Sequence, residues 1–276
     1  MPDNRYLHKI EKPLLPFATL SHRGRVRHNN EDRLAVQCFI TDEKEPRTVL
    51  LAALSDGVGG HRSGEIAAQI GITAIQEYFE ELTSLENPAG ALCDALVAAN
   101  LAVQNAGAAN PDLAGMGATC ICGLIVERTF FLAYLGDSRA YLLRGRLIRQ
   151  LSYDHTVLEE VLRFTPPGKR SQSRNHPLAH VLSRYLGSAH PAEVDTRIRS
   201  KTSRLRQKPP DPQNLDLRSG DRILLCSDGL TDMLTDSEIL SAIQGRALNK
   251  DVQRLVLGAL DKGGHDNVSV ILVEII

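Results

Sequence analysis

Residues 48–61 read TVLLAALSDGVGGH, and the rest of the chain is arranged around this stretch. The apolar run up to Ser55 predicts a buried β-strand, and Asp56 stands at the tip of that strand. Glycine occupies three of the next four positions, so the backbone there can approach an ion or a phosphate closely. The stretch therefore predicts a carboxylate that is held in place by a rigid core strand.

Other acids stand at the ends of strand-like runs in the same way. Asp228 follows the run RILLCS and precedes a glycine. Asp266 follows a pair of glycines and precedes the run VSVILVEI. Glu31, Asp32 and Asp137 border further apolar runs. The repetition raises the question of whether these acids converge on one metal site.

The chemistry of crowded carboxylates favours such a site. Carboxylates close together raise one another's pKa unless a cation lies among them. Oxygen ligands without cysteine or paired histidine favour Mg²⁺ or Mn²⁺, and two such ions ~4 Å apart can direct a shared water in line at phosphorus. Arg27, four residues before Glu31, could supply the fork that binds phosphate oxygens. A single Asp-Gly pair is usually only a turn. The metal site is therefore predicted from the several strand-end acids and Arg27 taken together.

The composition fits one large globular domain. The chain has 276 residues, of which 42% are hydrophobic, and a mean hydropathy of −0.17. No apolar run approaches the ~18–20 residues that cross a bilayer, and the N-terminus has no apolar signal region. The five cysteines lack a zinc-binding spacing and are interpreted as buried residues in a reducing cytosol. We therefore expect a cytoplasmic protein without a membrane partner.

Charge is distributed unevenly along the chain. The net charge of −1 gives no reason to expect a nucleic-acid partner. Residues 163–208, however, contain eleven Lys and Arg residues and only two acids. One hypothesis is that the basic flank at 197–214 attracts acidic or phosphorylated segments of protein substrates. The alternative is a solvated loop without that role.

Periodic patterns predict an α+β fold in layers. Residues 1–15 are expected to form a loose N-terminal arm. Helices are expected at 63–82, 88–108, 156–164, 237–244 and 249–260. Strands are expected at 17–21, 33–39, 48–55, 116–126, 129–135, 140–144, 147–151, 193–198, 222–227 and 268–275. Short links make several strands antiparallel neighbours, and the helices would cover the faces of a β-sandwich.

The two long helices are each expected to bury one face, because their apolar residues recur with the helical period. On the first helix the predicted buried face is Ile66, Ile70, Ala74, Tyr78 and Leu82. On the second helix it is Leu92, Leu96, Ala99 and Val103.

Seven motifs, in order, resemble those of the metal-dependent serine/threonine protein phosphatases of type 2C, or PPM. They are RHNNED (27–32), SDGVGGH (55–61), MGAT (116–119), GDSRA (136–140), DH (154–155), CSDGLTD (226–232) and GHDNVS (264–269). The resemblance covers essentially the whole chain and is closest to bacterial stand-alone members. It implies a four-layer αββα sandwich over residues 16–276, in which two antiparallel sheets are flanked by helix pairs. A small flap subdomain would lie at about 155–192, followed by an unusually basic loop at about 197–214.

The resemblance also implies a set of metal ligands for two Mn²⁺ or Mg²⁺ ions. Asp56 would bridge both ions. Asp228 and Asp266 would complete the first site, and Glu31 and the Gly57 carbonyl would hold the second. Asp137, together with Asp228, matches the positions that bind a third, weaker ion.

Four further residues receive roles from the resemblance. Arg27 would bind the substrate phosphate, and Asp32 would orient a metal-bound water. His61 would protonate the leaving oxygen, although it could instead cap the helix that follows. Asn267 would support Asp266.

Other motif residues are interpreted as structural. His155 and His265 are expected to support the fold, and Arg139 to support the core. Asp154 is expected in a turn, and Asp232 at the start of a helix.

Together these features predict a protein serine/threonine phosphatase in which a hydroxide bridging two metal ions attacks phosphorus in line, without a covalent intermediate. Its partners would be phosphorylated proteins and an opposing serine/threonine kinase, and we expect a monomer. One alternative is a non-catalytic pseudophosphatase that regulates a kinase or a phosphoprotein, although the matching acids are all retained. Another is a metal hydrolase acting on small phosphate esters.

Overall fold

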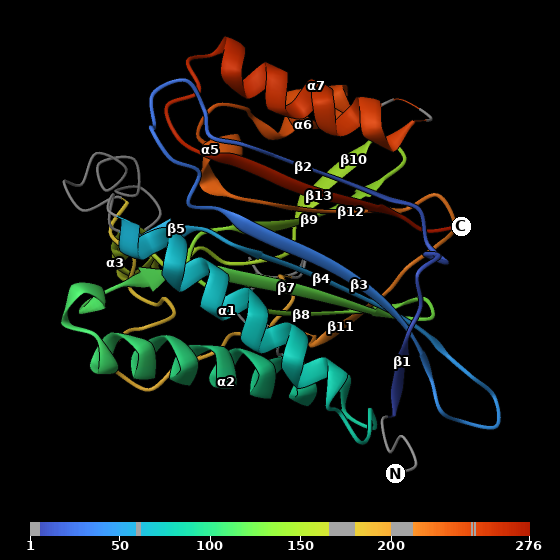
Figure 1. Cartoon of the computed structure of the whole chain (residues 1–276). Helices are drawn as coiled ribbons and strands as arrows, with labels where there is room; N and C mark the ends of the chain where they lie inside the picture. The colour runs from blue at the N-terminus through green and yellow to red at the C-terminus, as the bar shows by residue number, and fades with distance from the viewer. Residues whose placement is uncertain (1–5, 59–61, 166–179, 200–211, 244, 246) are drawn as a thin grey trace.

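Two antiparallel β-sheets pack face to face in the computed structural model, and helices cover both outer faces (Figure 1). The structure describes residues 6–58, 62–165, 180–199, 212–243, 245 and 247–276. The first sheet has the strand order β1-β3-β4-β7-β8-β11, and the second has the order β10-β9-β12-β13-β2. The predicted αββα sandwich is confirmed.

The first sheet lies against helices α1 (Arg62–Glu80) and α2 (Pro88–Ala109). Its strands are β1 (Leu7–Lys9), β3 (Arg33–Thr41), β4 (Thr48–Ser55), β7 (Cys120–Val126), β8 (Thr129–Leu135) and β11 (Asn214–Asp216). Two short strands, β5 (Gly57–Val58) and β6 (Gly117–Ala118), pair with each other beside this sheet.

The second sheet lies against the C-terminal helices α5 (Asp228–Thr231), α6 (Asp236–Ala242) and α7 (Leu248–Asp261). Its strands are β2 (Phe17–His22), β9 (Arg139–Arg144), β10 (Leu147–Gln150), β12 (Arg222–Cys226) and β13 (Val268–Glu274). Two further elements, the short 3₁₀ helix η1 (Pro111–Leu113) and the helix α3 (Val157–Phe164), lie in connecting segments.

Three apolar layers hold the sandwich together. One fills the space between α1–α2 and the first sheet, a second lies between the sheets, and a third lies under α5–α7. Side chains alternate across each central strand, so Leu51 of β4 faces the helices while Leu50 and Leu54 face the other sheet. These central strands are buried on both faces, which explains their continuous apolar runs.

The structure corrects several boundaries and one helix face. On α2 the predicted face is buried. On α1 the fully buried apolar residues are Ala67, Ala68, Ile72, Ile75 and Phe79. Of the predicted residues, Ile70, Ala74, Tyr78 and Leu82 are only partly buried against the core, and Ile66 is 37% exposed. Alanine at several α1 positions blurs the periodicity, because a small side chain fits a buried or an exposed position.

The predicted strand at 116–126 breaks at Thr119, and the predicted strand at 193–198 is reduced to a bridge between Asp195 and Tyr134. Residues 7–9 are not a loose arm. They form the edge strand β1 on β3, and Leu7 is buried. At the end of the basic loop, residues 214–216 form the strand β11. The flap residues 166–179 lie outside the described part of the chain.

Candidate metal centre

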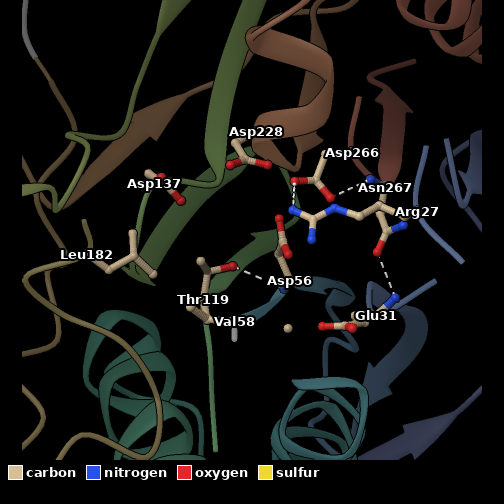
Figure 2. A pocket seen from close by; sticks show the side chains of 11 residues that line it. Arg27, Glu31, Asp56, Val58, Thr119, Asp137, Leu182, Asp228, Asp266 and Asn267 are labelled. Atoms are coloured by element: carbon tan, nitrogen blue, oxygen red, sulfur yellow. Dashed lines mark hydrogen bonds and ion pairs between the residues drawn. The ribbon is translucent and has the colours of Figure 1, made fainter. Parts of the chain in front are cut away.

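An acidic cavity of about 140 Å³ opens at one end of the sandwich, where strands of both sheets finish (Figure 2). Asp56 comes from the end of β4, Asp137 from the turn after β8, Asp228 from the first residue of α5, just after β12, and Asp266 from the turn before β13. Figure 2 shows the carboxylates of Asp56, Asp228 and Asp266 directed toward one another. The cavity is lined by Arg27, Glu31, Asp56, Gly57, Val58, Thr119, Asp137, Leu182, Asp228, Asp266 and Asn267.

The backbone of Asp56 is fixed by Thr119. The Asp56 amide donates to Thr119 Oγ1 at 3.1 Å, and the Thr119 amide donates to the Asp56 carbonyl at 2.8 Å. Thr119 separates β6 from β7, and at this position it forms both of these hydrogen bonds with Asp56. Thr119 was not predicted as a site residue, and its place in the MGAT motif opposite the DG turn was the available indication.

Glycine allows the Asp56 turn to lie against the start of α1. A Cβ on Gly57 would meet the backbone of Gly64 at 2.4 Å, and one on Gly64 would meet Glu31 Oε2 at 2.5 Å. The Gly57 carbonyl and the Glu31 carboxylate therefore share one side of the cavity with no intervening side chain.

Negative charge is concentrated enough to shift the ionisation of these acids. Burial, followed by the charges of neighbouring acids, raises the pKa of Asp56 well above its ordinary value. The same causes, in the same order, raise the pKa of Asp228. Asp228 Oδ1 is buried without a hydrogen-bond partner. These groups are costly to ionise as they stand, and a cation among them would reverse that cost.

Asp32 lies beneath the cavity and is 3% exposed. Ser227 Oγ donates to Asp32 Oδ2 at 3.0 Å, whereas Asp32 Oδ1 is buried without a partner. Burial raises the pKa of Asp32 to about 6. A carboxylate with this pKa can accept or release a proton near neutral pH.

Arg27 and Asp266 are in direct contact. Arg27 Nη2 donates to Asp266 Oδ2 at 2.7 Å, so the residue assigned to phosphate and a residue assigned to metal form an ion pair. Asp266 Oδ1 accepts from the backbone amide of Asn267 at 2.8 Å. The Asn267 side chain bonds to the loop at 23–31 rather than to Asp266.

Asp137 forms the opposite side of the cavity. Burial, followed by the charge of Asp154, raises the pKa of Asp137 to about 6. Asp154 is not simply a turn residue, because it accepts hydrogen bonds from the Arg139 guanidinium. Arg139 Nε donates to Oδ1 at 3.0 Å and to Oδ2 at 3.1 Å, and Nη2 donates to Oδ2 at 2.6 Å. Arg139 therefore supports the architecture next to Asp137, as predicted. Asp232 ends α5 rather than beginning a helix.

The donor set fits Mn²⁺ or Mg²⁺. The cavity offers carboxylate oxygens, a backbone carbonyl and a buried unpartnered oxygen, all hard ligands of the kind these ions prefer. The acids surround the cavity rather than closing on one point. Among the described residues, no three His, Cys, Asp or Glu side chains stand close enough to hold an ion unaided. Magnesium usually keeps several waters, so this spacing suits it.

The structure brings together nearly all the predicted site residues. Asp32 is adjacent but buried, and His61 lies outside the described residues. His155 is buried, and His265 is exposed on the loop before Asp266. Ser227, which holds Asp32, was not predicted, because a serine in a core strand carries no distinctive pattern.

The sequence matches one family model and is similar to several known proteins. The family model described as "Protein phosphatase 2C" matches residues 18–268. The chain is 32% identical over 256 residues to the serine/threonine phosphatase stp of Listeria innocua, covering 91% of this chain and 92% of that protein. It is 34% identical over 270 residues to the serine/threonine protein phosphatase PstP of Mycobacterium tuberculosis, covering 95% of this chain and 45% of the relative.

Solved structures show the same relationship. The structure of the PstP catalytic domain in complex with two manganese ions superposes with a TM-score of 0.72 at 32% identity. The alignment covers 95% of this chain and 98% of that one.

Proposed function

The chain belongs to the protein phosphatase 2C family of metal-dependent serine/threonine phosphatases, and we propose that the acidic cavity is its catalytic centre. One observation carries this assignment. Acids from the ends of strands in both sheets line a single cavity, and one of them, Asp228, has a buried oxygen without a partner. The substrates are phosphoserine and phosphothreonine residues of proteins.

Asp56, Asp228, Asp266, Glu31 and the Gly57 carbonyl would hold two ions, and Asp137 with Asp228 a weaker third. Bound Mn²⁺ or Mg²⁺ would supply Lewis acidity that activates water and stabilises charge developing on the phosphate.

The remaining residues position the substrate and handle protons. Arg27, which is half-exposed at the cavity mouth, binds the phosphate oxygens through its planar fork. Asp32, which is buried beneath the cavity, would orient the attacking water. His61 protonates the leaving oxygen; it lies outside the described residues, so this role rests on its motif. Asn267 holds the Arg27–Glu31 loop in place.

We also propose a cellular role, which the family and the substrate class support. We place the protein in the cytoplasm as a monomer that opposes a serine/threonine kinase in signalling. None of the described helices is both long and apolar enough to cross a membrane. The retained acids favour an active enzyme over a pseudophosphatase, and the family favours phosphoproteins over small phosphate esters.

Not every arginine of the basic flank is free to attract acidic substrate segments. Arg197 is ion-paired with buried Asp195, and the guanidiniums of both Arg197 and Arg199 lie 5.4 Å from the ring centre of Tyr153. Arg197 therefore has a structural partner, and its charge is largely neutralised. Attraction of acidic substrate segments would depend on Arg199 and on basic residues outside the described part of the chain.

A phosphothreonine peptide tests the catalytic assignment. Hydrolysis is measured for the wild type, for Asp228→Ala and for Asp94→Ala, each with Mn²⁺ and with EDTA. Asp94 is an exposed acid on α2 and serves as the matched control. We expect activity that needs both Mn²⁺ and Asp228 and does not need Asp94. An inactive, folded and metal-loaded wild type would refute the assignment.

A further inference from the structure

His155 is buried at the junction of three segments. It is 4% exposed, and its ring stacks on Tyr134 with the ring centres 5.1 Å apart and the planes 16° from parallel. Tyr134 lies in β8, just before the turn that carries Asp137. The third segment contains Asp195, whose backbone bridges to Tyr134.

The two ring nitrogens of His155 have different partners. The Gly136 amide donates to Nδ1 at 3.3 Å, so Nδ1 must carry a lone pair. Nε2 lies 3.4 Å from Asp195 Oδ2 and is therefore the protonated nitrogen. Burial lowers the pKa of His155, which agrees with a neutral ring. The two contacts together select one tautomer.

The backbone of His155 continues this connection. Its amide donates to the Gly136 carbonyl at 3.0 Å, and its carbonyl accepts from the Ser183 amide at 2.9 Å. Leu182, the neighbour of Ser183, lines the cavity beside Asp137 (Figure 2). His155 thus joins the Gly136–Asp137 turn to the segment that forms the same side of the cavity.

We propose that His155 is a positioning residue of the phosphatase: its Nδ1 fixes the Gly136–Asp137 turn by accepting from the Gly136 amide, and its backbone carbonyl ties that turn to the segment of Ser183 and Leu182. This inference rests on the proposed function of the cavity. Gly136 has a φ of +107°, which glycine adopts readily, and its buried amide would lose its hydrogen-bond partner without Nδ1. A purely aromatic side chain could stack on Tyr134, but it could not accept this bond.

Asp195 helps to fix the tautomer of His155. Its carboxylate is 2% exposed and also accepts from the Arg197 amide and from Arg197 Nε, both at 2.9 Å from Oδ1. Asp195 is thereby held ionised and aimed at Nε2. It keeps the proton on that nitrogen and leaves Nδ1 free to accept.

Two substitutions separate positioning from packing. His155→Asn places a side-chain oxygen near the position of Nδ1 and can keep the bond from Gly136, whereas His155→Gln reaches toward Asp195 and leaves the Gly136 amide unpaired. We expect kcat on a phosphothreonine peptide to stay within ~3-fold for Asn and to fall ~10–100-fold for Gln, as for residues that orient metal ligands. KM should change little, because neither side chain contacts the peptide. Equal losses in the two variants would overturn the proposal.

Binding of Mn²⁺ by calorimetry, without substrate, provides an independent readout. The Gln variant should lose affinity at the weaker, Asp137-dependent ion, and the Asn variant should not. If the wild type bound Mn²⁺ but did not hydrolyse the peptide, the proposed function would fail while this comparison still decided the role of His155. Should both variants unfold, Asp195→Asn keeps the His155 ring and removes the group that selects its tautomer. Unchanged kcat and Mn²⁺ binding in that variant would refute the mechanism.

Discussion

The side-chain oxygen of Asn267 accepts a hydrogen bond from the Glu31 amide at 2.8 Å, across 236 residues of sequence. The Asn267 amide group also donates to the carbonyls of Arg23 and Asn29, both at 2.9 Å. One buried side chain therefore holds the loop that presents Arg27 and Glu31 to the cavity.

Asn267→Ala should disorganise that loop without removing a metal ligand. We expect Mn²⁺ affinity and kcat/KM to fall ~10–100-fold, the range seen when a partner of a metal ligand is lost. Calorimetry and peptide hydrolysis measure the two effects. Asn29→Ala is the matched control, because it removes an exposed side chain and leaves its backbone carbonyl in place. A similar loss in both variants would point to general damage to the loop.

Asp137→Asn should stabilise the metal-free protein in a pH-dependent way. Burial raises the pKa of Asp137 to about 6 in the folded state, above its unfolded value, so the folded protein binds the proton more tightly. The free energy of unfolding of the wild type therefore falls as pH rises from about 4 to about 6. Above about pH 6, the ionisation of Asp137 no longer changes it. Asparagine resembles the protonated form, so its advantage should grow through this window and reach about 1–3 kcal/mol at pH 7.5.

Urea unfolding in EDTA at several pH values measures this difference. Saturating Mn²⁺ should reduce or reverse the advantage of Asp137→Asn, because a bound cation favours the carboxylate. An advantage that shrank as pH rose would contradict the raised pKa.

Arg139→Lys should destabilise the fold, although the charge is conserved. Lysine cannot reproduce the two-pronged contact with Asp154, whose side chain is 14% exposed. We expect a loss of about 1–2 kcal/mol in the free energy of unfolding. Arg47 makes a similar two-pronged contact with Glu43 on an exposed hairpin, so Arg47→Lys should cost less than about 0.5 kcal/mol. Chemical denaturation compares the two, and equal costs would show that burial is not the decisive factor.

Leu7→Ala tests whether β1 belongs to the folded domain. Leu7 is 2% exposed and joins the core between the first sheet and its helices. Truncation should lower the free energy of unfolding by about 2–4 kcal/mol. Leu14→Ala, at a residue that is 44% exposed, should change it by less than about 1 kcal/mol. A negligible effect at Leu7 would mean that β1 detaches readily.

The long apolar strands and helices could be predicted because burial on both faces leaves a continuous pattern. Short edge strands could not. The pairing of β1 depends on contacts with β3, and its three residues carry too little periodicity to be recognised. The predicted face of α1 was only partly right for a related reason, since Ala67 and Ala68 are fully buried while Ile66 is 37% exposed and the other predicted residues are partly buried. Tertiary packing decided which face turned inward.

The acids of the site could be predicted because glycine and strand ends mark them, and the family resemblance supplied their roles. The residues that hold these acids in place were harder to predict. The side chains of Thr119 and Ser227 form hydrogen bonds to Asp56 and Asp32, which are 63 and 195 positions away, and no local pattern encodes such distant contacts. The direct pairing of Arg27 with Asp266 was likewise not predicted, because each had been assigned to a different ligand.

The position of β13 has a consequence for when the enzyme becomes active during its synthesis. This strand lies between β2 and β12 in the second sheet, and the turn before it supplies Asp266 and Asn267. A ribosome-bound chain that ends before Asp266 would have a gap in the second sheet and would lack one acid of the cavity. We therefore expect a nascent chain to be inactive until β13 has been synthesised and has paired with β2 and β12.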